Sequence, residues 1–499
     1  MKSNFIQIHP KDNVAVALED VKKGCDVIIN GFSQRMEVLE DISFGHKIAL
    51  DDIKKGEMVI KYGAPIGHAV TSIKKGMWVH THNVRTNLEG KLEYTYNPVP
   101  AKKVDVRNRG RFFEGYKRAD GSVGTRNEIW IIPTVSCVNT TANTLAKLAQ
   151  ELYPDSCDGI FAYPHNAGCS QLGEDFEITQ KILASIVHHP NAGGVLLLSL
   201  GCENNDFEHF IPVLGDYDPK RIKFLVTQDV EDEIEEGLRL IGEIVENIKD
   251  DKRELLPVSS LKIAFKCGGS DAFSGITANP LCGHIAETVT ALGGSAILTE
   301  VPEMFGAETF LMNRADSQET FRKVVEMINS FKQYYIDHNQ PIYENPSPGN
   351  KRGGITTLEE KSLGCIQKGG QATVTDTLYY GEHCKKAGLN LMIGPGNDSI
   401  SITNLLSSGA QILLFTTGRG NPLGTAIPTI KISTNTNLYN RKKQWIDFDA
   451  GIILENKSFE EAADELWDLI IDVASGRRKT KNEVNGYREI MIFKQGVIL

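Results

Sequence analysis

The sequence has no long apolar run. No stretch of the 499 residues reaches the length of a transmembrane helix, and the beginning, MKSNFIQIHP, lacks the apolar core of a signal peptide. The nine cysteines are odd in number and scattered along the chain, which is typical of reduced thiols and not of a disulfide framework. We therefore expect a cytoplasmic protein with no membrane partner.

The sequence also has fewer basic than acidic residues, with 54 lysines and arginines against 64 aspartates and glutamates. The formal net charge is -10, which argues against nucleic acid as a partner. No phosphate-binding loop signature appears, and the glycines of GRGNPLG (418–424) do not match the spacing of a dinucleotide-binding loop. We therefore do not expect an enzyme driven by a nucleotide.

The composition that remains is that of an ordinary globular protein, with 41% hydrophobic and 24% charged residues. A chain of this length is too long for one compact core, so we expect several domains. In residues 1–97, short β-rich runs are separated by KKG turns that begin at Lys22, Lys54 and Lys74. This pattern predicts a small all-β module, and residues 98–113 are predicted to be a linker.

From residue 114 onward, apolar strands alternate with loops and helical stretches, which is the α/β pattern. We predict strands at EIWIIP, GIFAYP, GVLLLSLG, LKIAFKCGG, SAILTE, LNLMIG and QILLFTTG. The run ENPSPGN (344–350) indicates either a domain boundary or an ordered active-site loop. We predict two α/β domains, residues 114–345 and 346–499, with mainly parallel, Rossmann-like sheets.

Nearly every predicted strand of the α/β region ends in a short polar loop, and ligands of open α/β sheets bind at that edge. Cysteines stand in three of these loops, namely Cys169, Cys202 and Cys267. Alone, each is more often a small buried side chain than a ligand. Together they could hold an iron–sulfur cluster, although the compact cysteine spacing of ferredoxins is absent.

Other polar residues in these loops suggest acid–base chemistry and anion binding. His165, beside Asn166, is a candidate base, and a hydrogen-bonded structural histidine is an equal alternative. Arg126 and Asn127 could grip a carboxylate in fork geometry, against the alternative of a surface turn. Three carboxylates are many for the end of an apolar strand, so we expect at least one of them to have a metal, lysine or substrate partner: Glu300, Glu303 and Glu308.

The stretch VHTHN (79–83) is predicted to be a strand. Successive side chains of a strand point to opposite faces, so His80 and His82 would share one face and Thr81 would lie on the other. Two neighbouring imidazoles suit a metal or an anion, and a solvent-facing strand is the plain alternative.

Long motifs occur in a fixed order along almost the whole chain. They include GHKIAL, VIKYGAPIG, HTHNVRTNL, GTRNEIWIIPTVSCVN, GCSQLG, HPNAGGVLLLSLGCENN, CGGSDAFSGITANP, LTEVPEMFGAE, GGITTLEEKSLGC, PGNDSIS, TTGRGNP and WIDFDAG. In these motifs the chain resembles the altronate/galactarate dehydratase family. The resemblance implies an N-terminal SAF-type β-clip domain and the dehydration of D-altronate to 2-dehydro-3-deoxy-D-gluconate in hexuronate breakdown. It also implies a divalent metal, Fe(II) or Mn(II).

Dehydration of a 2,3-dihydroxy acid needs a base for the proton at carbon 2, assistance for the leaving hydroxyl, and positive charge for the enediolate-like state. We expect His165 and Glu303 to be catalytic and the metal to be held by His80 and His82, with a carboxylate or one of the three cysteines as a further ligand. Binding of the sugar acid is assigned to four residues, namely Arg126, Asn127, Asn166 and Arg419.

Several alternatives remain open. One is an iron–sulfur cluster on Cys169, Cys202 and Cys267 in place of the single metal ion. A second is a related substrate such as galactarate, and a third is a sugar-acid-binding protein without catalytic activity. A small-molecule sugar acid is the expected partner, and a homo-oligomer remains open.

Overall fold

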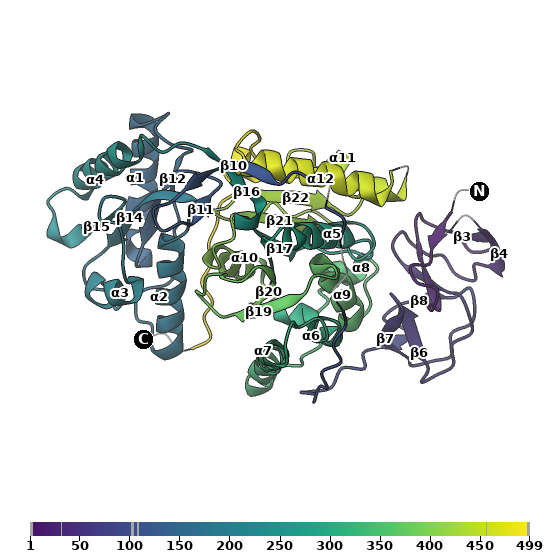
Figure 1. Cartoon of the computed structure of the whole chain (residues 1–499). Coiled ribbons are helices and arrows are strands. Elements are labelled where there is room, and N and C mark those ends of the chain that lie inside the picture. The colour runs from purple at the N-terminus through teal and green to yellow at the C-terminus, as the bar shows by residue number, and fades with distance from the viewer. Residues whose placement is uncertain (1–2, 31, 101–103, 107–108, 456, 497–499) are drawn as a thin grey trace.

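The computed structural model describes residues 3–30, 32–100, 104–106, 109–455 and 457–496. Figure 1 shows three parts side by side: an N-terminal β module, a central unit built on a seven-stranded sheet, and a unit built on a four-stranded sheet at the far end. Within the described part of the chain, no helix combines the length and the apolar character that a membrane crossing requires. The predicted combination of an all-β module and a parallel α/β body is confirmed.

The β module contains two small, mainly antiparallel sheets. The first has the strand order β4-β3-β1-β2-β5-β8 and the second β6-β7-β9. The strands are β1 (Phe5–Ile6), β2 (Val14–Ala17), β3 (Asp26–Ile29), β4 (Phe32–Glu37), β5 (Lys47–Ala49), β6 (Met58–Lys61), β7 (Ala64–Ala69), β8 (Trp78–Val79) and β9 (Val84–Arg85). Side chains such as Val59, Ile66 and Val79 belong to the same apolar cluster as Phe305 and Leu358, so the module packs onto the α/β body.

A short antiparallel sheet marks where the chain enters and leaves the four-stranded unit. Strand β10 (Phe112–Lys117) pairs with β11 (Val123–Gly124) and with β16 (Glu254–Pro257). The four-stranded unit lies between β11 and β16 in the sequence. Of the predicted linker 98–113, residues 101–103 and 107–108 lie outside the described residues, and its last two residues begin β10.

The four-stranded sheet is entirely parallel, in the order β13-β12-β14-β15. Its strands are β12 (Glu128–Pro133), β13 (Ile160–Ala162), β14 (Ala192–Ser199) and β15 (Ile222–Val226). Its helices are α1 (Asn139–Leu152), α2 (Gly173–Val187), α3 (Phe207–Leu214) and α4 (Glu233–Ile248). Both sheet faces are buried by helices, which explains why the strands are continuous apolar runs and not alternating ones.

The seven-stranded sheet is also parallel, in the order β19-β20-β18-β17-β21-β22-β23. Its strands are β17 (Lys262–Cys267), β18 (Ser295–Leu298), β19 (Val374–Leu378), β20 (Gly388–Met392), β21 (Ile412–Thr417), β22 (Thr429–Ser433) and β23 (Phe448–Asp449). All seven strands predicted from the sequence are confirmed, three in the four-stranded sheet and four in this one, since each apolar run coincides with a strand.

The helices of this unit are α5 (Ala278–Ala291), α6 (Glu308–Met312), α7 (Gln318–Asp337), α8 (Pro348–Arg352), α9 (Leu358–Cys365), α10 (Asp398–Ser407), α11 (Thr436–Arg441), α12 (Phe459–Ala474) and α13 (Lys481–Asn485). Helix α12 begins with a capping box between Ser458 and Glu461 and ends before Gly476, whose φ of 71° suits glycine. The division predicted between residues 345 and 346 lies within this unit, because β17 and β18 precede it and the other five strands follow. The run ENPSPGN leads into α8, beside the loops at the carboxyl edge of the sheet.

Candidate active site

Polar side chains collect at the carboxyl edge of the seven-stranded sheet. Cys267 is the last residue of β17. Glu300 follows β18, and Glu303 lies in the short helix η4 (Val301–Met304) that comes next. Asp398 begins α10, after the loop that follows β20. Ligands of parallel α/β sheets bind at this edge, so the cluster lies where chemistry is expected.

Two buried lysines bring positive charge into the cluster. Lys266 Nζ contacts Glu300 Oε1 and lies 2.8 Å from Asp398 Oδ1. Lys368 Nζ lies 3.4 Å from Glu300 Oε2. Burial would lower the pKa of Lys266, but Glu300 and Asp398 outweigh it and raise this pKa above its ordinary value. Burial would also lower the pKa of Lys368. Two cysteines and two glutamates outweigh burial and raise this pKa, namely Cys267, Cys365, Glu300 and Glu303. Both side chains are therefore ammonium ions.

The two glutamates of the cluster have opposite protonation tendencies. Glu303 Oε1 lies 2.7 Å from Lys361 Nζ of α9. Burial would raise the pKa of Glu303, but Lys361, Lys266 and Lys368 outweigh it and hold this pKa well below its ordinary range. Burial and the neighbouring Glu303 raise the pKa of Glu300 instead. Carboxylates whose environments separate their pKa values in this way suit acid–base chemistry.

Two thiols complete the cluster. Cys267 Sγ lies 3.3 Å from Cys365 Sγ, and Glu303 Oε2 lies 3.0 Å from Cys365 Sγ and 3.5 Å from Cys267 Sγ. Lys368 Nζ donates to Cys267 Sγ at 2.9 Å. The hydrogen bond from Cys365 and the charge of Lys368 lower the pKa of Cys267, whereas the contact with Cys267 and burial raise the pKa of Cys365. Cys267 is therefore the more acidic thiol of the pair.

The donor atoms of this cluster fit a metal ion. In the described parts of the chain, Cys267, Glu303 and Cys365 are the one set of three or more His, Cys, Asp or Glu residues whose ligand atoms lie within 4.8 Å of one another. Lys368 donates to Cys267 Sγ but has Glu300 as a second partner, so the sulfur can be released to a cation. Two sulfurs and one carboxylate suit ferrous iron better than manganous ion, which prefers oxygen ligands.

The β module supports this cluster through Glu360 of α9. Lys47 Nζ and Lys61 Nζ, both from the module, lie 2.9 Å and 2.7 Å from the Glu360 carboxylate, and all three side chains are buried. Burial would raise the pKa of Glu360, but the two lysines outweigh it and hold this pKa at about 2. The next residue in α9 is Lys361, which binds Glu303. The module therefore holds the helix that carries part of the site.

The predicted strand at VHTHN is wrong, because residues 80–83 form the turn between β8 and β9. The Asn83 side chain closes this turn by accepting from the His80 backbone N–H at 2.9 Å and donating to the Trp78 carbonyl at 2.8 Å. His80 is buried against Thr356 Oγ1 at 3.0 Å, and burial together with Lys47 lowers its pKa to about 3. His82 is exposed beside Trp78. Neither histidine belongs to the cluster around Cys267.

An arginine-lined cavity of about 350 Å³ lies at the same sheet edge, beside Asp271 of the loop after β17. None of its three guanidinium groups has a hydrogen-bond or ion-pair partner among the described residues. A second cavity, of about 10 Å³, shares Asp271 with it and is lined by Lys361 and Cys365 of the cluster. Arg419, predicted to grip a carboxylate, is one of the three arginines; the others are Arg352 and Arg441.

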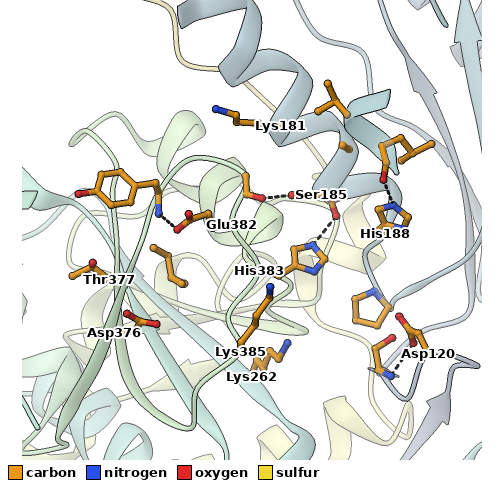
Figure 2. A pocket seen from close by; sticks show the side chains of 18 of the residues that line it. Asp120, Lys181, Ser185, His188, Lys262, Asp376, Thr377, Glu382, His383 and Lys385 are labelled. Carbon is orange, nitrogen blue, oxygen red and sulfur yellow. Dashed lines mark hydrogen bonds between the residues drawn. The ribbon is translucent and has the colours of Figure 1, made fainter. Parts of the chain in front are cut away.

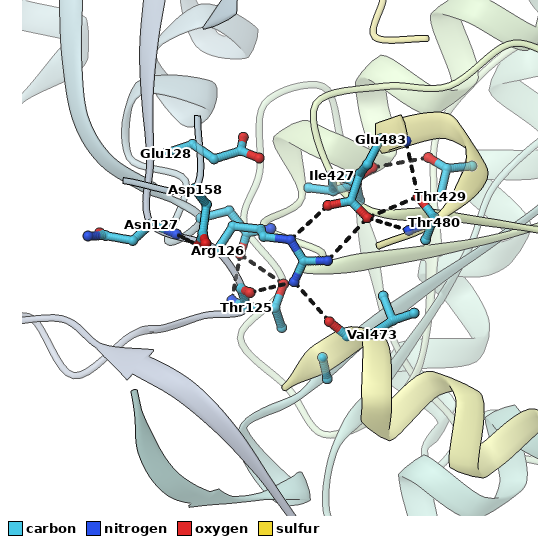
Figure 3. Close-up of polar contacts among 12 residues, drawn as sticks. Thr125, Arg126, Asn127, Glu128, Asp158, Ile427, Thr429, Val473, Thr480 and Glu483 are labelled. Atoms are coloured by element: carbon cyan, nitrogen blue, oxygen red, sulfur yellow. Dashed lines mark hydrogen bonds and ion pairs between the residues drawn. The ribbon is translucent and has the colours of Figure 1, made fainter. Parts of the chain in front are cut away.

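Arg126 and Asn127 have partners within the protein (Figure 3). Arg126 forms a two-pronged ion pair with Glu483, at 2.7 Å and 3.1 Å, and donates to the Val473 carbonyl at 2.8 Å. Asn127 Oδ1 accepts from Arg118 at 2.8 Å. The fork geometry expected from the sequence is present, but the carboxylate that it grips belongs to the chain. The Arg126–Glu483 ion pair connects the four-stranded unit to α13.

His165 and its neighbours lie at the carboxyl edge of the four-stranded sheet, apart from the Cys267 cluster. The His165 ring lies 2.7 Å from the Pro133 carbonyl through Nε2, and its Nδ1 accepts from the Ala167 backbone N–H at 3.2 Å. Burial lowers the pKa of His165 to about 4. Both ring nitrogens are thus occupied within the fold. Three further predicted residues are exposed in these loops: Asn166, Cys169 and Cys202.

A larger cavity, of about 1040 Å³, lies elsewhere (Figure 2). It is lined by Ser185 of α2, by His188 directly after that helix, by His383 and by Lys262. Lys262 begins β17 and Cys267 ends it, so this cavity lies at the opposite edge of the sheet from the cluster. It contains none of the residues predicted to act on a substrate.

Besides Asp398 and the cavity residues Arg352 and Arg441, sequence reasoning missed four residues of the Cys267 cluster. They are Lys266, Lys361, Cys365 and Lys368. One signal was present for Lys266, because a lysine within the apolar strand LKIAFKCGG predicts a buried ion pair. The other three stand in EEKSLGCIQKGG (359–370), which follows no strand and which strand-end reasoning therefore passed over.

Comparisons with known proteins match all three parts of the chain. The family described as "D-galactarate/Altronate dehydratase, C-terminal" matches residues 258–498, "D-galactarate dehydratase/Altronate hydrolase, second domain" matches 115–249, and "Altronate/galactarate dehydratase SAF domain" matches 3–87. The chain is 52% identical to an altronate dehydratase of Bacillus subtilis (strain 168) over the whole of both chains.

Two proteins of Escherichia coli (strain K12) are also similar over nearly their full lengths. An altronate dehydratase is 49% identical, with 99% of this chain and 100% of the relative covered. A galactarate dehydratase (L-threo-forming) is 32% identical, with 98% and 96% covered. The β module, the parallel α/β body and these full-length matches together show that the chain belongs to the altronate/galactarate dehydratase family.

Proposed function

We propose that the protein removes water from D-altronate to give 2-dehydro-3-deoxy-D-gluconate, with the Cys267 cluster and the arginine cavity as one active site. The observation that carries this proposal is the pair Glu300 and Glu303, buried among three lysines with their pKa values displaced in opposite directions. The full-length identity with altronate dehydratases supports D-altronate as the substrate.

Glu300 is the group best suited to take the proton from carbon 2 of the substrate. Its raised pKa makes its carboxylate a stronger base than an ordinary glutamate. Glu303, whose pKa is lowered, stays ionised and is a weaker base. When the proton at carbon 2 moves to the base, hydroxide leaves carbon 3 and takes up a proton as water. The enol that remains becomes the 2-keto acid.

Positive charge is placed for the anionic stages of this reaction. Lys266 and Lys368 are ammonium ions beside Glu300, and they can stabilise the enediolate-like state that forms as the proton leaves. Arg419 lines a cavity with two further free guanidinium groups, which suits the substrate carboxylate. The sugar acid would thus be bound by its carboxylate end near the lysines that stabilise its charge.

A divalent metal would be held by Cys267, Glu303 and Cys365, and ferrous iron fits this donor set better than manganous ion. When bound, it would supply Lewis acidity for the leaving hydroxyl and for the carboxylate. Cys365 would lose its thiol proton on binding, because the thiolate is the ligand form.

The test is keto-acid release by the purified full-length protein under anaerobic conditions with ferrous ion. D-Altronate, galactarate and D-gluconate are offered separately at equal concentration. We expect turnover with D-altronate at a kcat/KM at least tenfold above the other two. A preference for galactarate would change the proposed substrate but not the family. Binding of D-altronate without turnover would overturn the enzymatic proposal.

A further inference from the structure

Three exposed cysteines stand at the carboxyl edge of the four-stranded sheet: Cys137, Cys169 and Cys202. Each comes in the first loop after a strand, and the three strands, β12, β13 and β14, are immediate neighbours in the order β13-β12-β14. Cysteine is among the side chains most often fully buried, so three exposed cysteines on adjacent loops call for an explanation. The candidate site at Cys267 uses none of them.

Hydrogen bonds hold these three loops against one another. Each cysteine lies within two residues of a hydrogen bond to a neighbouring loop. The bonds are Ser136 N–H to the Ala167 carbonyl at 3.1 Å, Ser170 N–H to Asn204 Oδ1 at 2.8 Å, and Asn205 N–H to the Gly168 carbonyl at 3.3 Å. The loops therefore form one continuous surface with a thiol on each part.

Glycines directly before two of the cysteines make this arrangement possible. Gly168 precedes Cys169 with a φ of 99°, and Gly201 precedes Cys202 with a φ of 119°, both in the region that favours glycine. A Cβ atom at Gly168 would lie 2.0 Å from the Thr134 carbonyl oxygen. Only glycine therefore allows the loop with Cys169 to approach the loop with Cys137.

Helix N-termini also converge on this edge. Helix α1 begins two residues after Cys137, α2 begins four residues after Cys169, and α3 begins five residues after Cys202. The N-terminal end of a helix carries partial positive charge, which stabilises thiolates and anionic groups. The three thiols thus lie at an edge where the N-termini of three helices meet.

We propose that Cys137, Cys169 and Cys202 bind an iron–sulfur cluster with three cysteine ligands and one iron left open to an oxygen ligand. A single ion with sulfur ligands at about 2.3 Å requires sulfurs no more than about 4.6 Å apart. The three sulfurs do not form such a group within 4.8 Å, whereas a cluster of several irons spans a wider set of thiolates. The set differs from that considered from the sequence, because Cys267 lies on the other sheet and Cys137 takes its place.

The test measures iron and acid-labile sulfide in full-length protein reconstituted anaerobically with ferrous iron and sulfide. The variants are Cys137→Ala, Cys169→Ala and Cys202→Ala. Cys25→Ala is the matched control, since Cys25 is an exposed cysteine in the β module. Cys267→Ala reports on the buried site. Thermal unfolding of each variant checks that it is folded. These readouts require no turnover, so they do not depend on the proposed reaction.

We expect wild type, Cys25→Ala and Cys267→Ala to hold acid-labile sulfide in about equal amounts, with visible charge-transfer absorption. Cys267→Ala should lose only the iron of the buried Cys267 site. Each of the three edge variants should lose at least half of the bound sulfide while remaining folded. Wild type that takes up iron without sulfide, edge variants that keep the full sulfide content, or loss of the cluster in Cys267→Ala would each overturn the proposal.

Discussion

Glu360 and Lys361 are neighbours in α9, but their side chains bind partners in different parts of the molecule. Glu360 binds Lys47 and Lys61 of the β module, and Lys361 binds Glu303 of the candidate active site. One turn of helix therefore couples the position of the module to the geometry of the site. This contact explains physically why an N-terminal domain with no residue in the Cys267 cluster can still matter for turnover.

Glu360→Gln should destabilise the protein strongly. It leaves Lys47 and Lys61 buried without their counter-charge, and breaking a buried ion pair by removing one partner costs about 3–5 kcal/mol. Urea unfolding measures the effect, with Glu177→Gln as the control, since Glu177 is an exposed glutamate of α2. A loss no larger than that of the control would show that the three side chains do not act as a buried network.

The same glutamate should make stability depend on acid. The pKa of Glu360 is about 2 in the folded protein, below the ordinary value of 4.5, so its contribution is complete above about pH 4.5 and is lost as the pH falls toward 2. This difference corresponds to about 3 kcal/mol. Unfolding free energies measured from about pH 2 to about pH 7, a range that covers this window, should fall with acid in wild type. They should fall less steeply in Glu360→Gln.

Arg126 should prove to be a structural residue. Arg126→Met leaves the buried Glu483 carboxylate without its counter-charge, so we expect a loss of about 3–5 kcal/mol in unfolding free energy. The double variant Arg126→Met, Glu483→Met should recover most of that loss, because it removes both charges. In the folded fraction of either variant, KM for D-altronate should stay within about twofold of wild type, because neither side chain contributes to substrate binding. A large rise in KM without loss of stability would instead show that Arg126 binds the substrate.

Metal binding should follow the Cys267 cluster and not the histidines of the β module. Cys267→Ser and Glu303→Gln should each weaken ferrous-ion binding tenfold or more, in line with the roughly 10- to 100-fold effect that even supporting groups have at metal sites. His82→Ala should leave affinity unchanged, because the exposed His82 ring lies beside Trp78. Equilibrium dialysis under anaerobic conditions distinguishes the two sites. A loss of ferrous-ion affinity in His82→Ala alone would favour the turn at residues 80–83 as the metal site.

The sequence predicts the strands well and the site only in part. Apolar runs such as EIWIIP and QILLFTTG become buried parallel strands because both sheet faces are covered, so hydrophobicity alone marks them. The topology rule for such sheets then places Cys267 and Glu303 at the carboxyl edge. It cannot tell which strand ends face each other, and it therefore grouped Cys169 and Cys202 with Cys267 although they lie on a different sheet.

The remaining errors come from contacts between residues far apart in the sequence. Cys365 and Lys361 reach the site from α9, about 60 to 100 residues from their partners, and no local pattern marks them. Arg126 has the geometry of a carboxylate grip, but its partner Glu483 is 357 residues away. The turn at VHTHN depends on one asparagine side chain, a detail that the alternation of residue types does not reveal.

Arg419 should contribute to binding of the substrate carboxylate. Arg419→Met removes one of three free guanidinium groups from the arginine cavity, so KM for D-altronate should rise about tenfold or more with a smaller change in kcat. Arg419→Lys keeps the charge but loses the two-pronged geometry and should recover only part of the binding. Stability should change little, since the side chain has no partner among the described residues. The measurement is steady-state kinetics. An unchanged KM in Arg419→Met would mean that the substrate carboxylate binds elsewhere.

Glu300 should determine the acid limb of the pH–rate profile. A base must be deprotonated to act, so kcat should fall as the pH drops through the pKa of Glu300, which burial and Glu303 raise above the ordinary range. Glu300→Gln should lower kcat by about 10²- to 10⁴-fold, the usual contribution of a general base, and should remove that limb. Glu300→Asp keeps the carboxylate and should retain the limb at a reduced rate, which separates loss of the base from disturbance of the cluster. If Glu300→Gln keeps the wild-type profile, the proton at carbon 2 is taken by another group, and Lys266 and Lys368 would then hold Glu300 only as their counter-ion.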